Sequence, residues 1–248
     1  MKLTKAKKNY EIRSYECDKY GNLRLLTLMN IFQDIADSNA TEIGVGFDFC
    51  KENGLAWIGA NYHIIINKFP RLHQKITVLS WPSAEKKLGA YRDFLIEDES
   101  GNVMVKASSQ WILINFAKRR PVSLREHLPE YSAISERAVE TEFPKIEFSE
   151  NINRTQEFKI RFDDIDFNGH VNNAVYPLWA TEAAGDGFRE KNEPQEIEIA
   201  FKKEAFLGEN IVVESSVKPP LSSHIIKSAT DNRELARVKI SWRPLAQL

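Results

Sequence analysis

Apolar positions follow two periods in the first half of the chain. Around residues 28–36 they recur three and four residues apart, which predicts an amphipathic helix with a polar back; the positions are Leu28, Ile31, Phe32, Ile35 and Ala36. From residue 57 the period becomes two, and strand-like runs cover 57–66, 75–81, 88–97 and 103–115. With a further strand expected at 10–17, the pattern predicts strand, long helix and four consecutive antiparallel strands.

The second half repeats this order. A strand is expected at 157–163, a turn at 164–170 and a helix from about 173 to 189. Four strand-like runs follow at 197–203, 210–217, 223–229 and 235–242. Between the halves lies a charged stretch without a period. We therefore expect an N-terminal unit over 1–130, a connector over 131–155 and a C-terminal unit over 156–248.

The repeat extends to single residues. The run 18–23 (DKYGNL) aligns with 166–171 (DFNGHV), each between a strand and the helix of its half. The run 68–72 (KFPRL) aligns with 203–207 (KEAFL), and Trp111 matches Trp242 near the end of the last strand. The chain is therefore expected to hold two copies of one folding unit.

One amphipathic helix and an antiparallel sheet bury their apolar surfaces best when the sheet curls around the helix. The expected fold class is therefore α+β, with two tandem hot-dog units, each an antiparallel sheet wrapped around a central helix. Such units commonly pair through their sheets, which protects edge strands. A fused pair in one chain is expected here, and a homodimer of the whole chain stays open.

Composition excludes several classes of protein. Hydrophobic residues make up 42% and charged residues 28%, with 34 Lys and Arg against 35 Asp and Glu, so the net charge is −1. This balance is typical of a globular protein and speaks against a nucleic-acid binder. The two cysteines, Cys17 and Cys50, form neither a disulfide framework nor a zinc motif, and no metal or cofactor is expected. The N-terminus lacks a signal-peptide pattern and the most apolar stretch, 55–66, is too short to span a membrane, so a cytoplasmic location is expected.

The two copies differ where polar chemistry is concentrated. The second copy carries Asp166, Asn168, His170 and Glu204. The matching positions of the first copy hold Asp18, Tyr20, Asn22 and Phe69. Because only the aspartate is shared, one working site is expected in the second half, with the first half supplying scaffold and a pocket wall.

These residue types suit hydrolysis of a thioester. A turn before a helix offers backbone N–H groups where negative charge develops on a carbonyl oxygen. Asn168 and a neutral His170 can donate hydrogen bonds, and Glu204 can act as a base for water. A thiol leaving group, with a pKa of about 8.5 by analogy with cysteine, departs without a strong acid. A Ser-His-Asp triad is therefore not needed.

The run 161–176 (RFDDIDFNGHVNNAVY) resembles the signature of acyl-ACP thioesterases. The resemblance extends to Trp57 and to the stretches 70–81 and 107–111 (ASSQW), the last of which is followed by Arg119 and Arg120. The resemblance covers nearly the whole chain, from about residue 10 to 244.

The resemblance implies a tandem hot-dog enzyme that releases free fatty acids from acyl carrier protein. The family's catalytic aspartate, asparagine and histidine fall on Asp166, Asn168 and His170, and its glutamate falls on Glu204. Plant members have a cysteine after that glutamate, where this chain has Ala205. A cysteine nucleophile is thus unavailable there, which favours attack by water. The lack of a plastid transit sequence is typical of a bacterial member.

Several alternatives stay open. Glu204 is the expected base with Asp166 orienting its neighbours, but the reverse division is possible, and Asp166 could also be only a cap. The protein could act on acyl-CoA, or it could be a hot-dog 3-hydroxyacyl thioester dehydratase that uses Asp34 or Asp37 of the first helix. It could also bind acyl carriers without catalysis. The basic residues at 86–87 and 118–120 are either solvated charges or contacts for an acidic carrier-protein face.

Overall fold

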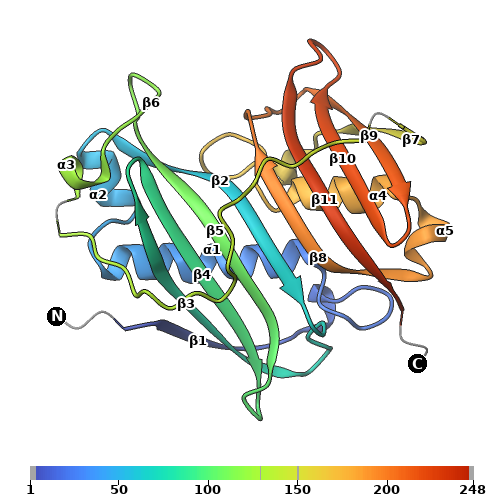
Figure 1. Cartoon of the computed structure of the whole chain (residues 1–248), viewed down its shortest axis with the longest axis horizontal. Helices are drawn as coiled ribbons and strands as arrows, with labels where there is room; N and C mark the ends of the chain where they lie inside the picture. Colours follow the sequence, from blue (N-terminus) through green and yellow to red (C-terminus); the bar gives the residue numbers. More distant parts are fainter. Residues whose placement is uncertain (1–3, 129, 150, 246–248) are drawn as a thin grey trace. The chain divides into compact units, whose positions relative to one another are not determined.

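The chain folds into two compact units. The computed structural model describes residues 4–128, 130–149 and 151–245 (Figure 1). Its contacts divide the chain into Met1–Phe143 and Pro144–Leu248, so the division falls within the expected connector 131–155. The first unit contains β1 (Ala6–Glu11), a 3₁₀ turn (Ser14–Glu16), α1 (Leu25–Glu42), α2 (Phe47–Glu52), β2 (Leu55–Ile66), β3 (Lys75–Lys86), β4 (Gly89–Asp98), β5 (Val103–Asn115), β6 (Arg120–Pro121) and α3 (Leu124–His127). The second contains β7 (Arg154–Lys159), a 3₁₀ turn (Phe162–Asp164), α4 (Val175–Ala183), α5 (Asp186–Arg189), β8 (Asn192–Phe201), β9 (Asn210–Lys218), β10 (Leu221–Ser228) and β11 (Glu234–Pro244).

Both units have the same strand order. The first unit's strands run β1-β3-β4-β5-β2, with β6 on β5, and every neighbouring pair is antiparallel. The second unit's strands run β7-β9-β10-β11-β8, again antiparallel. Matching strands occupy matching places, so the predicted internal repeat and the α+β hot-dog fold are confirmed.

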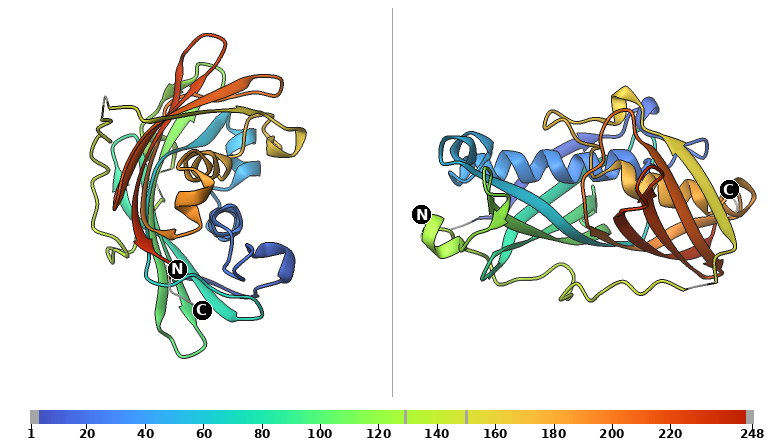
Figure 2. Two further views of the ribbon diagram at one scale, coloured as in Figure 1. Left: turned by 90° about the vertical axis from the view of Figure 1, so that its right-hand side faces the viewer. Right: turned by 90° about the horizontal axis from the view of Figure 1, so that it is seen from above.

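The long helix of the first unit lies against the concave face of its own sheet (Figure 2). All five positions of its predicted apolar stripe are buried, and Phe32 packs on Phe94 of β4 with ring centroids 4.6 Å apart. Each large side chain buried in this way contributes about 1.5–3 kcal/mol. The helical period of the sequence therefore identified the face that forms this core.

Two predicted boundaries were wrong for the same reason in both units. The first strand ends at Glu11 and β7 ends at Lys159, because a 3₁₀ turn follows each of them. In each turn a carboxylate accepts a backbone N–H three residues before it: Glu16 from Arg13 at 2.7 Å and Asp164 from Arg161 at 2.8 Å. Such local hydrogen bonds end a strand without changing the alternation of residue types.

The helix predicted from about 173 to 189 is also shorter than expected. It is divided into α4 and α5 by Gly185, whose φ of +93° lies in the left-handed region. Glycine adopts this conformation without the steric strain that a Cβ atom would bring. The apolar residues on both sides of the break hid it from the periodicity.

The beginning of the connector packs on the sheet of the first unit, on the face opposite α1 (Figure 2). Trp81 donates its indole N–H to the Glu136 carbonyl at 2.8 Å. Asp93 is fully buried there and accepts hydrogen bonds from the side chains of Ser83, Ser108 and Arg137 and from the Ala138 N–H. A buried carboxylate held in this way fixes the path of the connector.

None of the helices in the described parts of the chain combines the length and the apolar character needed to cross a bilayer.

Candidate active site

Three of the four predicted site residues lie in a turn that follows β7. Ile165 and Val171 form an isolated antiparallel bridge that closes this turn. Inside it, Asp166 donates its N–H to the His170 carbonyl at 2.8 Å, and the Gly169 N–H donates to the Asp166 carbonyl at 2.9 Å. Gly169 has a φ of +82°, a conformation that favours glycine. The backbone therefore reverses tightly and carries Asp166, Asn168 and His170 on one short loop.

The side chain of Asp166 supports the turn from within. Its Oδ1 accepts a hydrogen bond from the Asn168 N–H at 2.8 Å. This is the arrangement of an Asx turn, in which a carboxylate takes the place of a backbone acceptor. Asp166 therefore fixes the backbone from which the side chain of Asn168 extends.

Glu204 reaches the same turn from beyond the end of β8. The Val171 N–H donates to the Ala205 carbonyl at 2.9 Å and ties the two segments together. Next to this bond, Nε2 of His170 lies 3.7 Å from Oε2 of Glu204. That separation exceeds a direct hydrogen bond but is too short for a water molecule to lie between the two atoms, so a water molecule or a substrate atom that contacts both groups lies beside the pair.

Both groups of this pair are accessible. The side chain of His170 is 28% exposed and that of Glu204 is 32% exposed. The ring of Phe206 packs edge-on against His170, with centroids 5.2 Å apart. Phe162 and Phe167 are among the most exposed apolar side chains of the unit. Phe206 was not among the residues predicted from the sequence. The repeat offered a signal for it, since the first copy has Arg71 at the matching position.

The start of α4 differs from the expectation. The helix begins at Val175 instead of near Asn173. Asn172 accepts the Ala174 N–H on its side chain at 2.9 Å and the Val175 N–H on its carbonyl at 2.9 Å. These two N–H groups are therefore engaged within the protein, which leaves the side chains of the turn as the better candidates for polarising a carbonyl.

The structure thus brings together all four residues predicted from the sequence. Asp166, Asn168 and His170 share the turn, and Glu204 is held beside it. Ala205 is fully buried, with its carbonyl bonded to the turn. Among the described residues, no group of three or more His, Cys, Asp and Glu side chains is placed to hold a metal ion.

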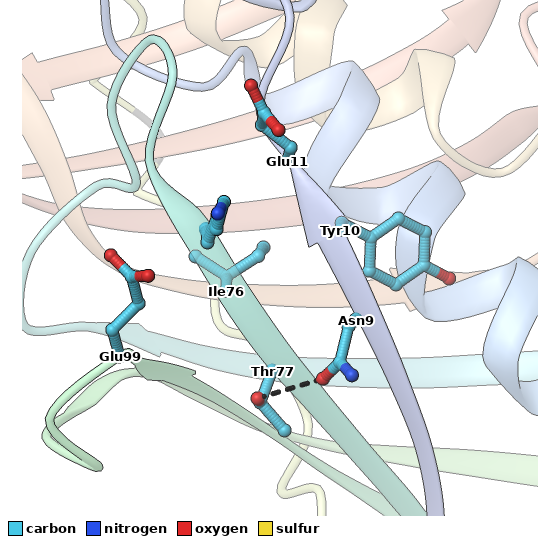
Figure 3. Close-up of a pocket in the computed structure, with 7 residues that line it drawn as sticks. Asn9, Tyr10, Glu11, Ile76, Thr77 and Glu99 are labelled. Atoms are coloured by element: carbon cyan, nitrogen blue, oxygen red, sulfur yellow. Dashed lines mark hydrogen bonds between the residues drawn. The ribbon is translucent and has the colours of Figure 1, made fainter.

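A hollow of about 400 Å³ lies elsewhere, on the first unit over β1 and β3 (Figure 3). It is lined by Asn9, Glu11, Lys75, Thr77 and Glu99, among others. Thr77 donates a hydrogen bond to the side chain of Asn9 at 3.1 Å. This hollow has no imidazole beside a carboxylate and is therefore a poorer candidate for hydrolytic chemistry.

Fold and site together define a protein of two hot-dog units with an imidazole–carboxylate pair in the second. Comparison with known families agrees: the model of the acyl-ACP thioesterase N-terminal domain matches residues 4–131, and that of the C-terminal domain matches residues 149–244. The chain therefore belongs to the acyl-ACP thioesterase family, as the sequence resemblance predicted.

Individual relatives are similar over nearly the whole chain. The chloroplastic palmitoyl-acyl carrier protein thioesterase of Gossypium hirsutum is 26% identical over 95% of this chain and 63% of its own length. The chain thus spans less than two thirds of this curated relative. A Lactobacillus plantarum structure, provisionally described as an oleoyl thioesterase, is 26% identical with a TM-score of 0.87 over 99% of this chain and 98% of that one. The 12:0-ACP thioesterase from Umbellularia californica, 23% identical, shares the fold with a TM-score of 0.86 over 97% of both chains.

Proposed function

We propose that this protein hydrolyses fatty acyl thioesters of acyl carrier protein to free fatty acid and carrier protein. Its family membership and the names of its relatives support this activity. The single observation that carries it is the His170–Glu204 pair at 3.7 Å, in the unit whose twin has neither residue.

In the proposed reaction Glu204 accepts a proton from water as the water oxygen attacks the thioester carbonyl carbon. Asn168 and His170 donate hydrogen bonds to the oxygen that becomes negative. The C–S bond then breaks and the carrier thiolate leaves, taking up the proton held by Glu204. The exposure of both His170 and Glu204 supports this proposal, because water must reach the pair.

Asp166 acts in this proposal as a positioning residue. Its carboxylate already accepts the Asn168 N–H within the turn. Asp18 of the first unit, where Asn22 and Phe69 stand in place of the histidine and the glutamate, accepts the same kind of bond from the Tyr20 N–H. A role that both copies share is better explained by turn structure than by proton transfer. This favours Glu204 over Asp166 as the base.

The surroundings of Asp34 argue against the form of the dehydratase alternative that uses this residue as its acid. Its carboxylate accepts hydrogen bonds from Lys8 at 2.9 Å and from the Tyr10 hydroxyl at 2.5 Å. A carboxylate engaged by two donors is poorly available for proton transfer to a substrate. These bonds give Asp34 a structural role between α1 and β1.

The test is release of thiol from a panel of acyl-ACPs and acyl-CoAs. We expect hydrolysis of acyl-ACP, a fall in kcat of about 10²–10⁴-fold for Glu204→Ala and of about 10²–10³-fold for His170→Ala. Glu157→Ala, which removes an exposed glutamate of the same unit, is the matched control and should leave kcat unchanged.

Other outcomes of this panel identify the alternatives. Faster turnover of acyl-CoA than of acyl-ACP would make the protein an acyl-CoA thioesterase. Loss of water from a 3-hydroxyacyl thioester without free thiol would make it a lyase. Tight binding of acyl-ACP without thiol release would make it a binding module. The proposal also includes a cytoplasmic location, which cell fractionation would test. Sedimentation decides between a monomer and a homodimer of the whole chain.

A further inference from the structure

Two turns lie side by side at one end of the first unit's sheet. One turn joins β3 to β4, and the other joins β5 to the short strand β6 (Figure 1). The Leu113 N–H donates to the Leu88 carbonyl at 3.1 Å, and Asn115 pairs with Arg120 across the second hairpin. We call the exposed side chains of these turns the basic tip; they are Lys87, Leu88, Phe116, Lys118, Arg119 and Arg120.

The basic tip concentrates positive charge on a protein that is nearly neutral. Segments 86–88 and 115–121 contain five Lys and Arg residues and no Asp or Glu, whereas the whole chain has a net charge of −1. Lys86 forms an ion pair with Glu142 at 3.0 Å, so it adds little to the local field. The four cations of the basic tip are exposed. Clustered cations of this kind steer the approach of a negatively charged partner.

Two large apolar side chains are exposed among these cations. Phe116 is 62% exposed and Leu88 is 43% exposed. Apolar anchors surrounded by charged groups are typical of a protein interface. A simple anion or a nucleic-acid backbone would use the cations alone, so the pair of apolar side chains favours a protein partner.

The second unit shows that the fold itself does not require this surface. Its turn between β9 and β10 consists of two prolines flanked by Lys218 and Leu221. At the end of β11, Arg243 is engaged by Glu193 at 2.7 Å. Among the described residues, the corresponding end has the exposed Lys191 and Lys218 but no run of cations like 118–120, so the same sheet topology forms with less positive charge there.

We infer that the basic tip is the docking surface for an acidic protein face, which under the proposed function is that of the acyl carrier protein. The inference rests on that function for the identity of the partner. Charge complementarity guides the encounter, and Leu88 and Phe116 contact apolar side chains of the carrier. Docking adds affinity for the carrier without taking part in the chemistry.

The test compares two triple variants with the same change in charge. Lys87→Glu/Arg119→Glu/Arg120→Glu reverses the basic tip, and Lys7→Glu/Lys191→Glu/Lys218→Glu reverses three exposed lysines elsewhere. For the tip variant we expect kcat/KM with acyl-ACP to fall about tenfold or more at low ionic strength, through KM, with a weaker dependence on salt. Turnover of an acyl-pantetheine, which has no protein carrier, should stay unchanged. Phe116→Ser should raise KM for acyl-ACP without altering the salt dependence.

Equal effects of the two triple variants on acyl-ACP, or an unchanged KM, would overturn the inference. So would tip-dependent binding of an oligonucleotide or of anionic phospholipid vesicles in place of the carrier. Direct titration with unacylated carrier protein separates docking from hydrolysis. If the enzyme hydrolyses no thioester but the tip variant alone loses carrier binding, the proposed reaction fails and the docking surface stands.

Discussion

The turn at Asp18 and the turn at Asp166 have nearly the same backbone. The aspartate N–H donates to the carbonyl four residues later at 2.8 Å in both. The glycine N–H returns to the aspartate carbonyl at 3.0 Å in the first and 2.9 Å in the second, with φ values of +75° and +82°. Two residues after the glycine, Leu23 donates its N–H to the Pro70 carbonyl at 2.8 Å and Val171 donates its N–H to the Ala205 carbonyl at 2.9 Å.

The side chains on these two backbones have little else in common. Asn22 of the first turn corresponds to His170, and the buried Phe69 corresponds to the accessible Glu204. The folding unit therefore needs the aspartate, the glycine and the bond to the neighbouring segment, because both copies keep them. It does not need the imidazole or the glutamate, which are present only where the proposed chemistry takes place.

The sharpest test of this comparison separates the two carboxylates of the second unit. Glu204→Gln removes the proposed base and should lower kcat by about 10²–10⁴-fold. In Asp166→Asn the amide oxygen can still accept the Asn168 N–H, so we expect a fall of less than about tenfold. Steady-state kinetics with acyl-ACP measure both, with thermal unfolding as a control for folding. An equal fall in kcat in the two variants would mean that Asp166 takes part in proton transfer in addition to supporting the turn.

The sheets of the two units differ at a matching buried position, which predicts a dependence of stability on pH. His224 of β10 faces Ser215, where β4 has Phe94 facing Ser80. Its ring nitrogens lie 2.7 Å from the Ser215 hydroxyl and 2.8 Å from that of Ser222, and burial lowers the pKa of His224 to about 3. In the unfolded chain the same group takes up a proton below about pH 6.5.

Because the unfolded state binds this extra proton, His224 stabilises the fold fully above about pH 6.5 and loses that contribution as the pH falls toward 3. The slope approaches about 1.4 kcal/mol per pH unit. Denaturant unfolding between these limits should show it in the wild type. His224→Asn should be less stable at neutral pH but should lack this part of the slope. An unchanged slope in the variant would show that other groups cause the dependence.

The smallest effect concerns the aspartate that both turns share. Asp18→Ala removes the acceptor for the Tyr20 and Asn22 N–H groups, and Asp166→Ala removes it for Asn168. Each loss should cost about 1 kcal/mol. Hydrogen exchange of these amides should report it as reduced protection in the affected turn. Only Asp166→Ala should also lower kcat; a comparable loss of activity in Asp18→Ala would mean that the first turn contributes to catalysis as well.

Local sequence patterns predicted most helices and strands of this protein and its division into two units. The three-and-four spacing identified α1 and its buried face, and the alternation identified the strands that follow, because burial on one face of an element repeats with the geometry of that element. The internal repeat predicted two units, and the differences between the copies singled out Asn168, His170 and Glu204 beside the shared Asp166. The 3₁₀ turns and the break at Gly185 were missed, since they depend on individual hydrogen bonds and a single φ angle that no period reveals.

Tertiary structure alone decided how these residues meet. The sequence carries no measure of the distance between His170 and Glu204; the bond from Val171 to Ala205 sets it. The packing of Phe206 on His170 and the adjacency of the two turns of the basic tip have the same origin. Residue type and period determine which surfaces are buried, whereas contacts between distant segments depend on strand pairing and register, which form only when the sheet closes around its helix.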